Sequence, residues 1–271
     1  MIEMNIIDKS CFSSPLGARG QMKRIVFSLA FLLMAIGVLA QKVNVAAAAN
    51  LRYVLEEIKT AYVKQNPKAK VNLTFGSSGT LVQQISNGAA FDFFMAADDE
   101  FPVKLKAKGL TTGAITVYAY GKLVLYSTTL PVDKKGLDVL KDASVKKIAV
   151  ANPTTAPYGE RAMTLVKSLK LDETLKEKIV IAENISVAAQ YAFTGNTELG
   201  FVALSLALAP EMDGKGSYYI IPQKLYEPIA QACVLIKKSS VNTEAAKFRK
   251  FVLSPANKAV WEKYGYAIPK S

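Results

Sequence analysis

Two adjacent serines, Ser77 and Ser78, stand between a predicted strand and a predicted helix. The strand covers 71–75, where apolar and polar residues alternate, and the helix covers 81–87 and ends at Gly88. The first backbone N–H groups of a helix have no partners within it, and the helix dipole makes that end positive. The junction can therefore hold an anion with uncharged donors. A serine before a helix can also serve only as its cap, so this motif alone leaves both interpretations open.

The same construction recurs at three more junctions, at Ala49–Asn50, Tyr158 and Asn184–Ile185. Asn50 and Asn184 are predicted to cap the helices that follow them. Tyr158 can offer its hydroxyl or its backbone N–H, and Ile185 offers its N–H. Ordinary packing of a strand end, a cap or a loop aromatic explains each junction taken singly. Together, two junctions from each half of the chain predict an anion cradle, because ligands of open α/β sheets lie beyond the carboxyl ends of strands.

The residue composition excludes most catalytic sites. The 271 residues include no histidine, so a Ser-His-Asp triad, a Cys-His pair and a histidine-ligated zinc are absent. The sequence Gly76–Gly79 is neither a Gly-x-Ser-x-Gly elbow nor a phosphate-binding P-loop, which needs a lysine. A Ser-Lys hydrolase stays open and would need a lysine within hydrogen-bond reach of Ser77 or Ser78. We predict a protein that is not an enzyme and has no cofactor.

The chain is basic, with 34 Lys and Arg against 22 Asp and Glu and a formal net charge of +12. Nucleic-acid binding would need these charges clustered with aromatic residues. The lysines are instead scattered along predicted helix faces and turns, so we predict no nucleic-acid partner.

Residues 1–40 are predicted to be a leader, with a signal peptide at about 22–40 that is removed after Ala40. It has a basic start and an apolar run at 25–39, which is shorter than the roughly 20 residues that span a bilayer. An uncleaved anchor is the alternative. The predicted location is the periplasm. Cys233 is then the one cysteine of the mature chain and is predicted to be a small buried apolar residue.

Strands and helices alternate along the mature chain, which predicts an α/β fold with mostly parallel sheets flanked by helices. Domain 1 is predicted to comprise 41–121 plus 229–271, and domain 2 to comprise 122–228. Chain crossings near 121 and 229 then form a hinge, as in binding proteins that close on a ligand. The predicted strands include 91–96, 123–126, 147–150, 179–182, 199–203 and 229–236, and two final helices cover 243–253 and 255–264.

At the four junctions the sequence resembles the periplasmic molybdate-binding proteins of bacterial ABC importers. The matching segments occur in the order of that family and span essentially the whole mature chain: 47–51, 75–80, 157–159, 183–185, 194–205 and 261–266. The resemblance implies a two-domain periplasmic binding protein of type II with its ligand in the cleft. Ala203 stands where one branch of the family has a ligand tyrosine, so the chain is placed with the asparagine-containing branch.

Carried over residue by residue, the resemblance implies five ligand-binding residues. Asn50 and Ser78 would give side-chain and backbone donors, and Ala49 a backbone donor, from domain 1. Tyr158 and Ile185 would donate from domain 2. The resemblance also implies a permease with its ATPase as partners, and we expect a monomer.

Molybdate agrees with this set of residues, because a tetrahedral dianion without a proton needs only hydrogen-bond donors. Tungstate is expected to bind as well. Sulfate, phosphate and ferric ion, the last through Tyr218 and Tyr219, are the alternative ligands. Phosphate would be favoured by an inward carboxylate, but Glu160, like Arg161 and Arg52, is predicted to face solvent. Asp98 is predicted to cap a helix.

Overall fold

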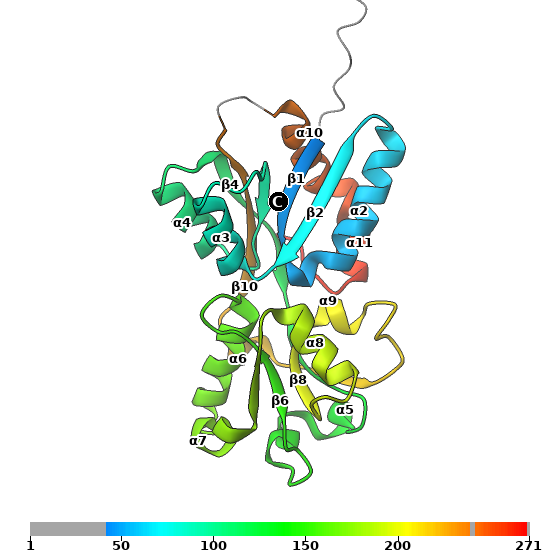
Figure 1. Cartoon of the computed structure of the whole chain (residues 1–271). Coiled ribbons are helices and arrows are strands. Elements are labelled where there is room, and N and C mark those ends of the chain that lie inside the picture. The colour runs from blue at the N-terminus through cyan, green and yellow to red at the C-terminus, as the bar shows by residue number, and fades with distance from the viewer. Residues whose placement is uncertain (1–41, 239–241, 270–271) are drawn as a thin grey trace, which may run out of the picture. The chain divides into compact units, whose positions relative to one another are not determined.

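A computed structural model describes residues 42–238 and 242–269, and the predicted leader 1–40 lies outside them. The described residues belong to one compact unit, Gln41–Ser271, which contains two five-stranded sheets (Figure 1). Within the described ranges, none of the helices has the length and apolar character that a bilayer crossing requires.

The first sheet has the strand order β2-β1-β3-β10-β4. Its strands are β1 (Lys42–Ala48), β2 (Lys70–Gly76), β3 (Phe93–Met95), β4 (Thr111–Gly121) and β10 (Ile229–Ile236). β1 runs parallel to β2 and β3, whereas β10 runs antiparallel to β3 and β4. Because parallel strands end at the same edge, the carboxyl ends of β1, β2 and β3 lie together.

The second sheet repeats this arrangement with the order β7-β6-β8-β5-β9. Its strands are β5 (Leu123–Ser127), β6 (Ile148–Ala151), β7 (Ile179–Ala182), β8 (Leu199–Ala203) and β9 (Ser217–Ile220). β6 is parallel to β7 and β8, and β5 is antiparallel to β8 and β9. Each sheet therefore has three parallel strands extended by two antiparallel ones, so both sheets are mixed.

Helices cover the sheets and bury their apolar residues. The helical elements are η1 (Ala49–Leu51), α2 (Arg52–Gln65), α3 (Ser78–Ser86), α4 (Glu100–Ala107), α5 (Val132–Lys135), η2 (Gly136–Lys141), α6 (Pro157–Ser168), α7 (Asp172–Leu175), η3 (Lys176–Lys178), α8 (Ile185–Phe193), α9 (Leu204–Ala207), η4 (Gln223–Leu225), α10 (Thr243–Val252), η5 (Pro255–Asn257) and α11 (Lys258–Lys263). In the first sheet α2 and α10 pack on one face and α3 and α4 on the other (Figure 1).

The predicted strands 179–182, 199–203 and 229–236 coincide with β7, β8 and β10. The predicted strand 91–96 is shorter in the structure, where β3 covers Phe93–Met95. β4 was not predicted from the sequence. It is an edge strand with Gly113 at φ +72° and register shifts against β10.

The chain passes between the sheets at two neighbouring places. β4 ends at Gly121, with only Lys122 between it and β5, and Gly121 pairs with Ile229 at the start of β10. The strands of the first sheet come from 42–121 and 229–236, and those of the second from 123–220. The division into domains 41–121 plus 229–271 and 122–228, and a hinge motion between them, stay predictions.

Candidate functional site

The five residues predicted as ligands, Ala49, Asn50, Ser78, Tyr158 and Ile185, line one small cavity. The other lining residues are Ala48, Gly76, Ser77, Ala97, Ala156 and Pro157. The centre of a water-sized sphere can move through about 10 Å³ of this cavity, which is room for about one water molecule and far below the roughly 300–1,000 Å³ of organic-ligand sites. Every lining side chain is uncharged. The structure brings the five residues together, and their role as ligands stays a prediction.

The β2–α3 junction separates the roles of its two serines. Ser77 is the N-cap of α3, because its side chain accepts the backbone N–H of Thr80 at 3.4 Å. α3 begins at Ser78, three residues earlier than predicted. The Ser78 hydroxyl oxygen accepts the backbone N–H of Ala97 at 2.9 Å, so its own proton remains to be donated. The Ser78 N–H lies in the first turn, where a helix offers no carbonyl to receive it.

Asn50 does not cap a helix, so that prediction was wrong. It lies within the 3₁₀ turn η1, which continues into α2, and Ala48 occupies the cap position without a side-chain bond. Its buried Nδ2 donates to Gln231 Oε1 at 2.9 Å and to Tyr266 Oη at 2.8 Å. These partners come from the far end of the chain, which is why a local rule about caps could not find them. The other amide atom, Oδ1, is buried without a hydrogen-bond partner.

Tyr158 occupies the first turn of α6, directly after Pro157, as the sequence predicted. Its hydroxyl accepts Gln231 Nε2 at 3.0 Å and lies only 2.0 Å from where a Cβ on Gly121 would be. The hydroxyl therefore points to the β4 and β10 strands where the chain crosses. Burial raises the pKa of Tyr158 well above its ordinary value, so the phenol keeps its proton. Because the hydroxyl is held by Gln231, the backbone N–H in the first turn of α6 is the donor that we expect Tyr158 to give to a ligand.

The predicted cap at Asn184 is confirmed. Its side chain accepts the N–H groups of Ser186 at 3.0 Å and Val187 at 3.2 Å. The N–H of Ile185, the first residue of α8, is then the donor next to the cavity.

Several hydrogen bonds beside the cavity join the two halves of the chain. Gly79 N donates to Thr155 O at 2.8 Å, and the Ser186 hydroxyl donates to Ala49 O at 3.0 Å. The Ser205 hydroxyl donates to Asn50 O at 2.9 Å. The cavity is therefore enclosed by residues from both halves of the chain.

Charged residues lie near the cavity but do not line it. Asp98 accepts the N–H of Phe101 at 3.0 Å, which confirms that it caps the start of α4, although Asp99 holds the formal cap position. Burial raises the pKa of Asp98 to about 6.

Arg161 pairs with Glu160, and its side chain is only 18 % exposed, so the prediction that it faces solvent was wrong. Arg52 is exposed, and its guanidinium lies 4.8 Å from the centre of the Phe75 ring.

The alternative sites find less support. Tyr218 and Tyr219 are consecutive in β9 and so point to opposite faces, which prevents them from holding one ion together. The hydroxyls of Ser77 and Ser78 bond to Thr80 and Ala97, and no lysine bonds to them among the described residues. Within those residues, no cluster of three His, Cys, Asp or Glu could hold a metal ion. Cys233 is buried, as predicted.

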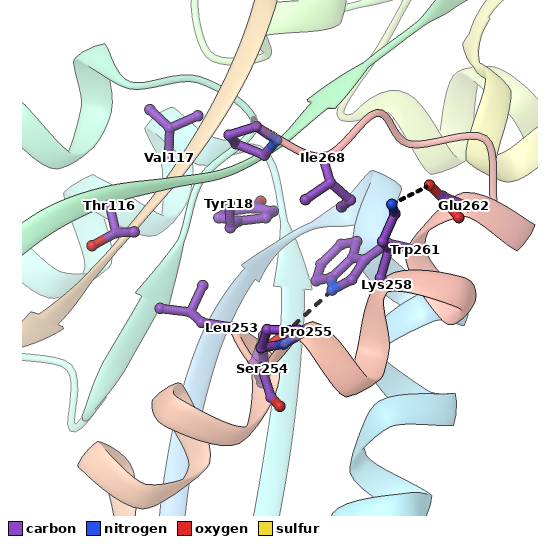
Figure 2. Close-up of a pocket in the computed structure, with 12 residues that line it drawn as sticks. Thr116, Val117, Tyr118, Leu253, Ser254, Pro255, Lys258, Trp261, Glu262 and Ile268 are labelled. Carbon is purple, nitrogen blue, oxygen red and sulfur yellow. Dashed lines mark hydrogen bonds and ion pairs between the residues drawn. The ribbon is translucent and has the colours of Figure 1, made fainter. Parts of the chain in front are cut away.

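A larger cavity of about 470 Å³, by the same measure, lies beside α11 (Figure 2). Its lining includes the aromatic rings of Tyr118 and Trp261. Lys258 pairs with Glu262 at 3.7 Å, and Trp261 Nε1 donates to Val252 O at 3.4 Å. Lys258 and Trp261 therefore already have partners within this lining.

Sequence reasoning missed three residues that contact Asn50 or its partners, namely Gln231, Tyr118 and Tyr266. Gln231 is fully buried and also receives the Tyr118 hydroxyl on Oε1 at 3.1 Å. The signal was available in part, because Gln231 is the one amide in the otherwise apolar strand 229–236. A buried amide must find partners, and this strand offers none from its own side chains.

Comparisons with known proteins agree with the fold. Residues 43–267 match the family described as bacterial extracellular solute-binding protein. The chain is 40 % identical to the molybdate-binding protein ModA of Azotobacter vinelandii, over 91 % of this chain and 98 % of that protein. It is 37 % identical to ModA of Rhodobacter capsulatus, over 86 % and 91 %.

Solved structures agree with these sequence comparisons. The periplasmic molybdate-binding protein of Azotobacter vinelandii has a TM-score of 0.79 at 32 % identity, covering 84 % of this chain and all of that one. The sulfate-binding protein SubI of Mycobacterium tuberculosis, with a TM-score of 0.70 at 14 % identity over 84 % and 87 %, shares the fold alone. The chain belongs to the family of bacterial extracellular solute-binding proteins.

Proposed function

We propose that this protein binds molybdate in the periplasm and delivers it to the permease of an ABC importer. The observation that carries the proposal is the enclosed cavity with an uncharged lining, where the first turns of α3, α6 and α8 meet. The similarity to molybdate-binding proteins supports the same ligand.

The donors of this cavity suit a fully ionised oxyanion. Backbone N–H groups of Ser78, Tyr158 and Ile185 and the Ser78 hydroxyl can donate, and no carboxylate lines the cavity to accept a proton from the ligand. Each hydrogen bond to a charged group contributes about 1.5–3 kcal/mol. Several such bonds in a closed cavity can hold a dianion without a salt bridge. Phosphate, which carries a proton at neutral pH, would lack a carboxylate to accept it.

The remaining parts of the proposal follow from this role. Tungstate, which has the same tetrahedral geometry and charge, binds at the same residues. The protein acts by binding and not by catalysis, as a monomer that an ATPase-driven permease receives. Export through a signal peptide at about 22–40 and cleavage after Ala40 would place it in the periplasm, and those residues lie outside the described ones.

Calorimetric titration of the purified exported protein tests the proposal. We expect tight one-to-one binding of molybdate and tungstate, and much weaker binding of sulfate and phosphate. Tight binding of sulfate without binding of molybdate would overturn the assignment. Mass spectrometry of the same sample determines whether the chain begins at Gln41, and sedimentation determines whether it is a monomer.

A further inference from the structure

The net charge is divided unevenly between the two halves of the chain. Residues 41–121 and 229–271 hold 17 Lys and Arg against 8 Asp and Glu, whereas residues 122–228 hold 13 against 12. Nearly all of the net positive charge of the mature chain therefore belongs to the half that carries the first sheet. The lysines are dispersed along the sequence, so their arrangement in space depends on the fold.

One end of the first sheet collects seven exposed lysines. It is the end where β1, β2 and β4 begin and β10 finishes, and it lies opposite the carboxyl ends of β1 and β2, which adjoin the cavity. These residues, which we call the basic end, are Lys42, Lys64, Lys68, Lys70, Lys106, Lys108 and Lys237.

Four of the seven lysines surround the start of β1 and β2. Lys42 and Lys70 are partners in the pairing of these two strands, and Lys64 and Lys68 lie at the end of α2 and in its connection to β2. Asn242 Nδ2, just before α10, donates to Lys42 O at 3.2 Å, and Figure 1 shows α10 beside the start of β1. Segments distant in the sequence therefore meet at this point.

The other three lysines lie at the same end, on the far side of the sheet. Lys106 is in the last turn of α4 and Lys108 follows that helix. The backbone N–H of Lys237, just after β10, donates to Leu110 O at 2.9 Å, directly before β4 begins. Lysines from three connections are thus gathered along one end of one sheet.

The carboxylates at this end are already neutralised. Asp92 is buried, lies 2.6 Å from Lys238 Nζ and accepts the N–H of Asn44 on β1 at 2.8 Å. Glu244, in the first turn of α10, pairs with Lys247 at 3.3 Å. Within the part of the chain that the structure describes, no lysine of the basic end has an ion pair. Their mutual repulsion disfavours the compact state, and a negatively charged partner would relieve it.

The surroundings of these lysines favour a broad charged surface as the partner. The exposed large apolar side chains of the described residues are Val103, Tyr120, Ile181 and Ile220, and none of them lies in the connections that carry the basic end. A protein partner is held mainly by buried apolar and aromatic anchors. Anionic lipid head groups need only charge, and each lysine near them strengthens association about five-fold.

The predicted leader is joined to the fold at the same end. The apolar run 25–39, predicted to enter the membrane during export, precedes Lys42 in the sequence, and Lys42 opens β1. We propose that the basic end binds the surface of an anionic phospholipid membrane through its head groups. The inference goes beyond the proposed function and does not depend on it, because no lysine of the basic end lines the cavity.

Co-sedimentation of the purified exported protein with lipid vesicles tests the inference. We expect binding to phosphatidylcholine vesicles that contain about 30 % phosphatidylglycerol, and no binding to vesicles of phosphatidylcholine alone. Raising the salt concentration from about 0.02 M to about 0.5 M should release the protein, because the screening length then falls to a few ångströms. Equal binding to both lipid compositions, or binding to neither, would overturn the inference.

A variant of the basic end measures its contribution. Combining Lys42→Gln, Lys64→Gln, Lys68→Gln and Lys70→Gln should weaken binding to the anionic vesicles about 100- to 1,000-fold, the product of the four contributions. These side chains are exposed, so urea unfolding should show that the variant is folded. Titration with molybdate should match the wild type, since the cavity lies at the other end of the sheet.

The matched control makes the same change of charge in the second half of the chain. It combines Lys134→Gln, Lys167→Gln, Lys176→Gln and Lys224→Gln, all at exposed positions, and should bind the anionic vesicles as the wild type does. An equal loss in both variants would mean that net charge alone causes binding, which overturns the inference. Capture by immobilised polyglutamate without binding to vesicles would indicate an acidic protein partner and would overturn it as well.

Discussion

Gly79 donates its backbone N–H to the carbonyl oxygen of Thr155 at 2.8 Å, which joins the start of α3 to the loop before α6. A Cβ on Gly79 would lie 2.9 Å from Thr155 Cα and 3.1 Å from the Phe101 ring. Only glycine lets the two backbones approach this closely. The bond is next to the cavity and joins the two halves of the chain around it.

Gly79→Ala should therefore hinder closure around the ligand. We expect molybdate affinity to fall by about 1 to 3 kcal/mol, the usual cost of an added methyl group in a packed contact. Titration calorimetry measures the loss. Gln83→Ala, on the exposed side of the same helix, serves as the control and should bind normally. Unchanged affinity in Gly79→Ala would show that this contact is not needed for binding.

The two serines at the β2–α3 junction should give opposite results when replaced by alanine. Ser77→Ala removes a cap and should lower the free energy of unfolding by about 1 kcal/mol. Ser78→Ala removes a hydroxyl that lines the cavity and should weaken molybdate binding by about 1.5 to 3 kcal/mol. Urea unfolding and calorimetry on both variants separate the effects. If Ser78→Ala binds molybdate as tightly as the wild type, Ser78 does not donate its hydroxyl to the ligand.

Tyr53 and Glu211 form another contact between the halves, with Tyr53 Oη 2.7 Å from Glu211 Oε2. Burial and the neighbouring Glu211 carboxylate raise the pKa of Tyr53 to about 12, so the hydroxyl remains a donor at every pH up to about 10. Tyr53→Phe should weaken molybdate binding by about 0.5 to 1.5 kcal/mol, because the bond joins the two halves of the chain. A double-mutant cycle with Glu211→Gln measures the coupling. A coupling of zero would mean that the pair does not contribute to closure.

The buried carboxyl of Asp98 should make the free energy of unfolding depend on pH. Burial raises its pKa from 3.8 to about 6, so the folded protein holds a proton that the unfolded chain releases. The stabilisation that this bound proton gives the folded protein is fully present below about pH 3.8 and is lost as the pH rises through about 6. The wild type should lose about 3 kcal/mol across this interval from this group, by the linkage relation. Asp98→Asn keeps an oxygen that can accept the Phe101 N–H and should lack this slope.

Urea unfolding of both proteins at several pH values between 4 and 7 tests this prediction. The difference in unfolding free energy between Asp98→Asn and the wild type should grow in favour of the variant as the pH rises. A difference that stays constant across the interval would exclude a raised pKa at Asp98.

The local junctions could be predicted from the sequence because they depend on neighbouring residues. Asn184 capping α8 and Pro157 opening α6 follow from short-range rules, and strands such as 199–203 follow from continuous apolar runs. Five candidate ligands could be named because each sits where a strand passes into a helix and because the motifs occur in a known order.

The partners of those residues could not be predicted in this way. Asn50 bonds to Gln231 and Tyr266, more than 180 positions away along the chain, and its predicted cap was wrong for that reason. β4 was missed although residues that favour strands, Thr, Ile, Val and Tyr, fill most of 111–120. The side of Tyr158 that faces the cavity depends on Gly121, which belongs to a different sheet.

The sequence by itself determined the alternation of strands and helices, the junctions with free N–H groups and the absence of histidine chemistry, since these are properties of composition and local pattern. The tertiary structure decided which of the donors are free. Hydrogen bonding within a buried cluster is shared among residues from distant segments, so the direction of the Tyr158 hydroxyl and of the Asn50 amide is set only when β4, β10 and the C-terminal segment come together.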